Sequence, residues 1–525
     1  MGTAFPTKLY GPPSAPLALK GYESPAAERL SPTPIRPGVP GKAPFWNEQA
    51  KQFIWAPAFD FHLVPGAAAY RFTVSSKGGQ SHTFEGKEPW APLTRIWGDV
   101  PVGAASLKVE ALNEQREVIG VAGTRQFHRG APFNGTCGKP VLAHGQSARV
   151  ALEGLMAEPF VRSWRTTGRP AEEYGLYRYA SKVISAVMTA SALYANQSPR
   201  PADAGEAVEI GRRAADFLLG LSGPAGSALE YFPPTYHGVK PGERENENWT
   251  MLISPAEAGQ GYLNLYDVAQ DRKYLEVAKR IAGTYQKLQF PSGTWHLKVD
   301  RRTGKPIVEN ELIPSVVISF LDRLVEQYKV AEARPTLERA VRWMMENPVR
   351  TFDWSAQFDD GKQRKPYQNL SKHEACEFAG YLFVHAGKDA SRIALAEELL
   401  RFAEDQFVVW ERPPDLKPRS ESLSPEHWFM PCSMEQYAMF EPISGSSAFM
   451  IVAYIRAWQV TGKPLYRAKA ESLANALTAA QQQHHGRFPT RMVQRDQAYW
   501  INSTVNTIRA MNLLAETRAT ADGRP

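Results

Sequence analysis

Residues 375–383 read Ala375-Cys-Glu-Phe-Ala-Gly-Tyr-Leu-Phe, and the charged, amphipathic segment 394–407 follows them after a short turn. A helix that is apolar on all sides is buried, whereas a helix with one apolar stripe lies at the surface. This stretch therefore predicts an inner helix followed by an outer helix. From about residue 145 onward the 3.6-residue period recurs in the same paired order. The expected helices are 146–163, 178–196, 204–221, 254–270, 272–288, 311–329, 333–346, 371–387, 390–406, 443–461, 464–482 and 497–516.

These segments form six inner and outer pairs if 146–163 is the outer partner of the last inner helix. The economical arrangement is an (α/α)6 toroid, which we expect to span residues 145–518. In a toroid every inner helix points the same way, so the long aromatic links between pairs gather on one face with the inner-helix N-termini. Binding and catalytic residues concentrate on such loops. We therefore place the functional site on that face.

The hairpin rhythm resembles the six-hairpin glycosidase superfamily, which includes glycoside hydrolases, polysaccharide lyases and sugar epimerases. The resemblance rests on the repeated pairing and on phrases such as Ser292-Gly-Thr-Trp-His-Leu-Lys-Val and Ser446-Ser-Ala-Phe, the latter followed by Thr461-Gly-Lys. It implies a mainly α fold and a carbohydrate-active enzyme. Because members of the superfamily perform different chemistry on one scaffold, the reaction has to be inferred from individual residues.

The N-terminal region has a different period. Between residues 46 and 135 apolar and polar residues alternate, as in Tyr70-Arg-Phe-Thr-Val, with Gly and Pro at the turns. This alternation predicts a small all-β sandwich. The segment resembles a fibronectin type III module, a type of domain that usually acts as a spacer or as a carbohydrate-binding accessory. Residues 1–45 precede it as a proline-rich lead.

Composition and charge exclude several classes of protein. The 525 residues carry 61 Lys and Arg against 54 Asp and Glu, a formal net charge of +7, and the basic residues are scattered without a nucleic-acid-binding motif. No segment reaches the roughly 18–20 apolar residues of a membrane helix. The proline-rich start is typical of a mature, processed N-terminus, so we expect an exported protein of the periplasm or the extracellular space. The small charge excess suits an acidic substrate.

Sugar-binding side chains concentrate in the long links and near the inner-helix N-termini. Aromatic faces stack on the C–H faces of sugar rings, while amides and carboxylates bind the hydroxyl groups. For any single aromatic residue the alternative is packing within the loop. As a set they favour a groove for a poly- or oligosaccharide, formed by Asn248, Trp249, Trp295, Trp354, Tyr367, Trp428, Tyr499 and Trp500.

The densest polar cluster, Ser-Lys-His-Glu-Ala-Cys-Glu at 371–377, lies at the start of the fourth inner helix. Glycoside hydrolysis needs two carboxyl groups, one protonated and one ionised. Because consecutive inner helices lie side by side, the leading catalytic pair is Glu374 with Glu435 or Glu441. A glycoside hydrolase is therefore the favoured function.

Some of the carboxylates have structural alternatives. Ser371-x-x-Glu374 and Ser254-x-x-Glu257 match the capping box, in which the glutamate only bonds the first backbone N–H groups of its helix. Asp359-Asp-Gly-Lys matches a turn at the tip of a loop, so we interpret Asp359 as structural.

A β-eliminating polysaccharide lyase would use a different set of groups. It needs a base for the C5 proton of a uronic acid, and the candidate bases are His373 and Tyr437. A third hypothesis is a non-catalytic glycan-binding protein. Ultraviolet absorbance of an unsaturated product separates the lyase from the hydrolase.

The two polar clusters also show a local resemblance to the zinc-cysteine β-L-arabinofuranosidases. In that family a Glu-x-Cys and a later Cys-Cys bind zinc, and one thiolate attacks the sugar. The matching residues here are Glu374, Cys376 and Cys432, but Ser433 stands where the second cysteine of the pair is expected. We therefore expect no cofactor, with zinc as the alternative.

Overall fold

The structure is a computed structural model that describes residues 17–18, 50–238, 247–359, 365–416, 424–495 and 497–521. The proline-rich lead at 1–45 lies outside these residues except for 17–18, which form strand β1 (Leu17–Ala18). In the ranges described, none of the helices combines the length and the apolar character needed to cross a membrane.

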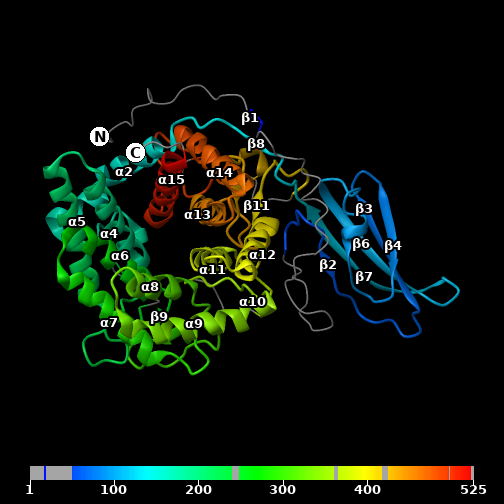
Figure 1. Cartoon of the computed structure of the whole chain (residues 1–525), viewed down its shortest axis with the longest axis horizontal. Coiled ribbons are helices and arrows are strands. Elements are labelled where there is room, and N and C mark those ends of the chain that lie inside the picture. Colours follow the sequence, from blue (N-terminus) through cyan, green and yellow to red (C-terminus); the bar gives the residue numbers. More distant parts are fainter. Residues whose placement is uncertain are drawn as a thin grey trace.

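The C-terminal part of the chain forms a double ring of helices (Figure 1). The inner helices are α4 (Ala180–Gln197), α6 (Ser254–Ala269), α8 (Ser315–Glu326), α11 (His373–Val384), α13 (Ser444–Thr461) and α15 (Ile501–Ala521). The outer helices are α5 (Pro201–Leu221), α7 (Arg272–Leu288), α9 (Arg334–Glu346), α12 (Ala390–Phe407), α14 (Pro464–Gln483) and α2 (His144–Ala157). Each inner helix contacts its own outer partner and the next inner helix.

The ring closes between its last and its first inner helix, because α15 contacts α4 and also packs on α2. At this seam the Tyr174 hydroxyl donates to the Tyr499 carbonyl oxygen (2.7 Å) and accepts from the Ile501 N–H (3.1 Å). The predicted (α/α)6 toroid is therefore the fold of the described helices.

Several helix boundaries differ by a few residues from the sequence-based expectation, among them α5, α11 and α15, and two of the differences have a clear local cause. The segment 146–163 forms two helices, α2 and α3 (Pro159–Thr167), and Pro159 occupies the first turn of α3. Proline has no N–H to continue the preceding helix, so the chain turns there. Helix α8 begins at Ser315, after Pro314, because the residues before it form a link in which Glu311 pairs with His296.

Small residues let the inner helices approach closely. A Cβ atom at Gly259 of α6 would lie 2.3 Å from the Phe320 ring of α8, which is closer than any real contact. The inner helices are rich in Gly, Ala and Ser for a steric reason. The backbone of one helix packs directly against side chains of the next helix, which leaves no room for larger residues.

The N-terminal region contains an antiparallel sheet in the order β4-β3-β6-β7. Its strands are β3 (Ala69–Ser76), β4 (Ser81–Gly86), β6 (Gly103–Leu112) and β7 (Val118–Arg129). Phe72 pairs with Phe84 on one side and with Val109 on the other, and its ring is buried. A second ladder joins β2 (Ala58–Phe59) to β5 (Ala91–Pro92). These strands lie within the segment predicted as β, and its likeness to fibronectin type III stays a prediction.

The β region is attached to the outside of the ring, beside α12 (Figure 1). The buried Asp405 carboxylate of α12 accepts hydrogen bonds from the N–H groups of Ile54 (2.8 Å) and Trp55 (2.7 Å). Burial raises the pKa of Asp405 to about 7, although these two N–H groups oppose the shift. This attachment leaves the centre of the ring to the helices alone.

Candidate functional site

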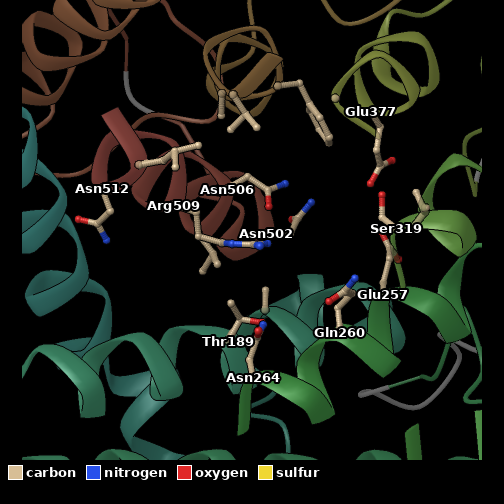
Figure 2. Close-up of a pocket in the computed structure, with 18 of the residues that line it drawn as sticks. Thr189, Glu257, Gln260, Asn264, Ser319, Glu377, Asn502, Asn506, Arg509 and Asn512 are labelled. Atoms are coloured by element: carbon tan, nitrogen blue, oxygen red, sulfur yellow. The ribbon is translucent and has the colours of Figure 1, made fainter. Parts of the chain in front are cut away.

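The inner helices enclose a cavity of about 660 Å³ at the centre of the ring. Its walls carry carboxyl, amide, hydroxyl and guanidinium groups on otherwise apolar helices. Figure 2 shows ten of these residues: Thr189, Glu257, Gln260, Asn264, Ser319, Glu377, Asn502, Asn506, Arg509 and Asn512. Such convergent polar groups in a concave site are typical of small-molecule and glycan binding.

The cavity runs along the axis of the ring. It is lined on α4 from Lys182 to Gln197, and on α15 from Asn502 to Glu516. At a rise of 1.5 Å per residue these spans correspond to about 20 Å. The cavity therefore extends from the inner-helix N-termini, where we expected the site, towards the opposite end of the helices.

Glu257 enters the cavity from the first turn of α6. Burial raises its pKa to about 7; the charges of Asp359 and Glu377 add to the shift, and Lys182 opposes it. The capping-box interpretation fails here, because Ser254 Oγ lies 2.8 Å from Thr235 Oγ1 and no described side chain caps α6.

Glu377 enters the same cavity from the second turn of α11. Burial raises its pKa to about 7, while the nearby Ser319 and Ser315 hydroxyls of α8 and the positive charge of Arg509 oppose the shift. Two carboxyl groups that titrate near neutral pH thus line one cavity. In Figure 2, Glu257, Ser319 and Glu377 lie on one side of the cavity, and Arg509 extends towards its centre from another side.

Lys182 and Asp359 form an ion pair of 2.9 Å at the N-terminal end of the cavity. Burial lowers the pKa of Lys182, but the charges of Asp359 and Glu257 outweigh it and leave the pKa raised. Asp359 is 9% exposed, and its backbone oxygen accepts from the buried Lys298 Nζ (2.8 Å). The interpretation of Asp359 as an exposed loop tip is therefore wrong, because Asp359 itself is buried and contacts two lysines.

Of the predicted cluster at 371–377, Cys376 and Glu377 line the cavity, whereas residues 371–375 do not. Glu374 is 5% exposed, and its Oε2 atom has no hydrogen-bond partner among the described residues. Burial raises its pKa to about 8. The capping box is not formed, since Ser371 Oγ accepts from the His373 N–H (3.2 Å) and donates to the Glu435 carbonyl oxygen.

His373 is held between a cation and an aromatic ring. Its Nε2 atom lies 3.3 Å from Lys372 Nζ, and its ring centroid lies 4.6 Å from that of Phe449. Burial lowers the pKa of His373 well below its usual range, and Lys372 adds to the effect. The imidazole is therefore neutral at physiological pH.

Lys372 joins this helix start to the long link before α13. Its Nζ atom donates to the Met434 carbonyl oxygen (2.6 Å), to Ser446 Oγ (2.6 Å) and to the Glu435 carbonyl oxygen (3.2 Å). Burial lowers its pKa to about 7. These contacts fix the link in place and make Lys372 a structural cation.

The two proposed partners of Glu374 also lie in this packed region. Burial raises the pKa of Glu435, and Lys372 opposes the shift. Glu441 is buried and accepts from Arg491 Nε (2.6 Å). In the part of the chain that the structure describes, Glu374, Glu435 and Glu441 do not line the cavity. Tyr437 is buried as well; its hydroxyl donates to Gln406 Oε1, and burial raises its pKa well above the usual range, so it is no candidate base.

Four of the aromatic residues predicted to bind sugar belong to the packed core. Trp295 and Trp354 are each 0% exposed, and Tyr367 and Trp428 are buried too. Trp295 Nε1 donates to the Tyr285 carbonyl oxygen (2.8 Å). A substrate has no access to these ring faces, because the links that carry them fold back onto the helices.

The other four predicted sugar-binding residues are more accessible. Trp249 and Trp500 are half-buried, and each packs beneath a lysine: Lys298 Nζ lies 4.6 Å from the Trp249 ring, and Lys182 Nζ 5.4 Å from the Trp500 ring. Tyr499 is half-buried with its hydroxyl 3.1 Å from His484 Nδ1, and Asn248 is exposed.

The cysteines are dispersed. Cys376 Sγ lies 3.3 Å from Met450 Sδ, and Cys432 Sγ lies 3.4 Å from Met430 Sδ. Burial raises the pKa of Cys376 to about 12 and that of Cys432 further. Within the described ranges no three His, Cys, Asp or Glu residues are placed to hold a metal ion. The residues therefore do not fit a zinc-thiolate site.

A repeated spacing in the sequence marks the cavity, although its residues were not among the predicted site residues. Asn502, Asn506, Arg509 and Asn512 recur every three or four residues on α15, so they share one face of that helix. Polar residues with this spacing on an otherwise buried helix indicate a solvent-filled or ligand-filled interior.

No protein-family model matches the chain, and no curated protein matches it. Among solved structures, a family 76 glycoside hydrolase from a bovine Bacteroides thetaiotaomicron strain is 9% identical, with a TM-score of 0.48 over 86% of this chain and 93% of that chain. A cellobiose 2-epimerase from Spirochaeta thermophila is 11% identical, with a TM-score of 0.49 over 70% and 97% of the two chains. A D-mannose isomerase is 9% identical, with a TM-score of 0.49 over 71% and 98%. At these values the similarity assigns no activity to this chain.

Proposed function

We propose that the protein is a carbohydrate-active enzyme that hydrolyses glycosidic bonds in the central cavity, with Glu257 and Glu377 as its catalytic carboxyl groups. The observation that carries this proposal is that both side chains line one cavity and both have a pKa of about 7. At neutral pH such a pair holds one proton between two groups. Glycoside hydrolysis requires this state, with one carboxyl as acid and one as base or nucleophile.

The surroundings of the two glutamates favour different roles. Burial and the negative charges of Asp359 and Glu377 favour the protonated form of Glu257 and outweigh the opposing charge of Lys182, so we assign Glu257 as the general acid. The nearby Ser319 and Ser315 hydroxyls and the positive charge of Arg509 favour the ionised form of Glu377. We assign Glu377 as the base or nucleophile.

The remaining walls fit a sugar better than an apolar ligand. Gln260, Asn264 and Asn506 place amide groups in the cavity, and Phe449 adds an aromatic face. Amides donate to and accept from hydroxyl groups, and aromatic faces pack on C–H groups. The resemblance of the repeated helix pairs to the six-hairpin glycosidase superfamily also supports a carbohydrate substrate.

The test is an assay of reducing-end release from a broad panel of plant, algal and bacterial polysaccharides and oligosaccharides. We expect turnover of at least one glycan by the wild-type protein and none above background by Glu257→Gln. A protein that turns over no glycan but binds one would support the non-catalytic hypothesis and overturn this proposal.

A polysaccharide lyase is the second candidate, and Arg509 is the observation that favours it. A guanidinium in the cavity can neutralise the carboxylate of a uronic acid, which β-elimination requires. Ultraviolet absorbance of the product decides between the two reactions, because elimination leaves an unsaturated uronide and hydrolysis does not. Export and the fibronectin-type identity of the β region stay predictions.

A further inference from the structure

Arg456 and Arg509 line the cavity, and Arg323 lies behind its wall residues Gln260 and Asn264. Arg456 donates to Gln459 Oε1 (2.9 Å). Arg323 of α8 is saturated: its guanidinium donates to Gln260 Oε1 (2.8 Å), Asn264 Oδ1 (2.7 Å) and Asp267 Oδ2 (2.8 Å). Arg509 of α15 forms no hydrogen bond or ion pair with any described residue. Figure 2 shows its guanidinium extended into the open cavity.

The side chain of Arg509 is exposed to the open space of the cavity, although the residues before and after it on α15 are buried. The surrounding helices still limit its hydration and lower the pKa of Arg509, and the nearby positive charge of Arg323 adds to the effect. The negative charge of Glu377 opposes this shift only in part. A cation placed in this way gains from an anion that binds beside it.

The neighbours of Arg509 on the same helix face define what kind of anion fits. Asn502, Asn506 and Asn512 lie three or seven residues from it along α15, and all three line the cavity. Amides do not neutralise a charge, but they bind hydroxyl groups. The wall therefore suits a molecule that carries one oxyanion and several hydroxyls.

We propose that Arg509 binds the carboxylate of a uronic acid residue, so that the substrate of the cavity is an acidic glycan. The planar guanidinium fork matches a carboxylate with two parallel hydrogen bonds. This inference rests on the proposed function for the identity of the ligand as a glycan. A sulfate ester presents a similar oxyanion, so sulfated neutral sugars form a separate arm of the test.

The experiment measures the binding of oligosaccharides, so its outcome does not depend on whether the protein turns them over. Wild-type protein and the variants Arg509→Gln, Arg509→Lys and Arg213→Gln are applied to an array of uronate oligosaccharides, their carboxyl-reduced counterparts and sulfated neutral oligosaccharides. Arg213 is the matched control, because it pairs with Glu209 (2.7 Å) on the outer helix α5 and its loss removes the same charge. The dissociation constants of the ligands found are then measured by calorimetry, and the melting temperature of each variant shows that it is folded.

We expect the wild-type protein and Arg213→Gln to bind a uronate oligosaccharide about 10- to 100-fold more tightly than its carboxyl-reduced form. Arg509→Gln should lose this preference while its affinity for the reduced form stays the same, and Arg509→Lys should keep part of it. Equal binding of acidic and reduced forms by the wild-type protein would overturn the inference and leave the proposed function standing. Preference for sulfated sugars alone, or an unchanged preference in Arg509→Gln, would also overturn it. Acid-specific binding without turnover would instead overturn the proposed function.

Discussion

Two regions of this molecule are rich in titratable side chains, and they differ in what surrounds those side chains. In the packed region at the start of α11, Lys372 donates to three oxygen atoms and Glu374 is almost fully enclosed. In the central cavity, Glu257, Glu377 and Arg509 face open space. Both regions perturb pKa values by burial, so a perturbed pKa alone does not identify a catalytic site. Access for a substrate separates the two regions.

The largest expected effect tests this comparison directly. Glu257→Gln and Glu377→Gln should each lower kcat by about 100- to 10,000-fold, because each removes a proton donor or acceptor. In the wild-type protein kcat/KM should peak near pH 7 and fall on both sides, since both carboxyl groups have a pKa of about 7. Rates of reducing-end release across pH provide the measurement.

Glu435→Gln is the control for this first prediction, because the residue is a glutamate of the packed region. We expect it to keep most of its activity. A larger loss of kcat in Glu435→Gln than in Glu257→Gln would move the active site back to the packed region.

The second prediction concerns aromatic residues. Trp295→Ala should lower the free energy of unfolding by about 3–5 kcal/mol, because a fully buried indole and its hydrogen bond to Tyr285 are lost. Phe449→Ala, which alters the cavity wall, should instead raise KM about two- to tenfold. Urea titrations and steady-state kinetics of both variants test the contrast. A KM effect in Trp295→Ala without a loss of stability would contradict the assignment of Trp295 to the core.

The third prediction uses the buried Glu374. Its pKa is raised from 4.5 to about 8, so the folded state holds a proton that the unfolded state releases over this interval. The contribution of Glu374 to stability is therefore complete below pH 4.5 and is lost as the pH rises to 8. The unfolding free energy of Glu374→Gln relative to wild type should increase by about 1.4 kcal/mol per pH unit in this window. A difference that does not change with pH would show that Glu374 is ionised in the folded protein.

The sequence predicted the fold well, because helix periodicity and pairing are local properties. The apolar stretch Ala375–Phe383 and the amphipathic segment 394–407 indicate an inner and an outer helix without any tertiary information. Pro159 is the exception, because the apolar period continues across it but the helix ends before it and a new helix begins there.

The site was predicted less well, because access depends on how the links fold. Trp295 and Trp354 were assigned to the correct links, but no local pattern shows that these links turn their rings inward. Asp359 has the composition of an exposed turn, and its burial depends on Lys182, which is distant in the sequence. Glu257 matched a capping box so closely that the spacing shared with Gln260 and Asn264 was missed.

The seam between α15 and α4 also constrains how the chain is made. Tyr174 and Tyr499 meet across a sequence separation of 325 residues. During synthesis α4 leaves the ribosome long before α15 is made. The apolar face of α4 that packs on α15 therefore stays exposed to solvent while the other hairpins assemble. A nascent or C-terminally truncated chain is therefore an open arc of hairpins with two exposed ends. We expect chaperone binding and aggregation to concentrate at those ends.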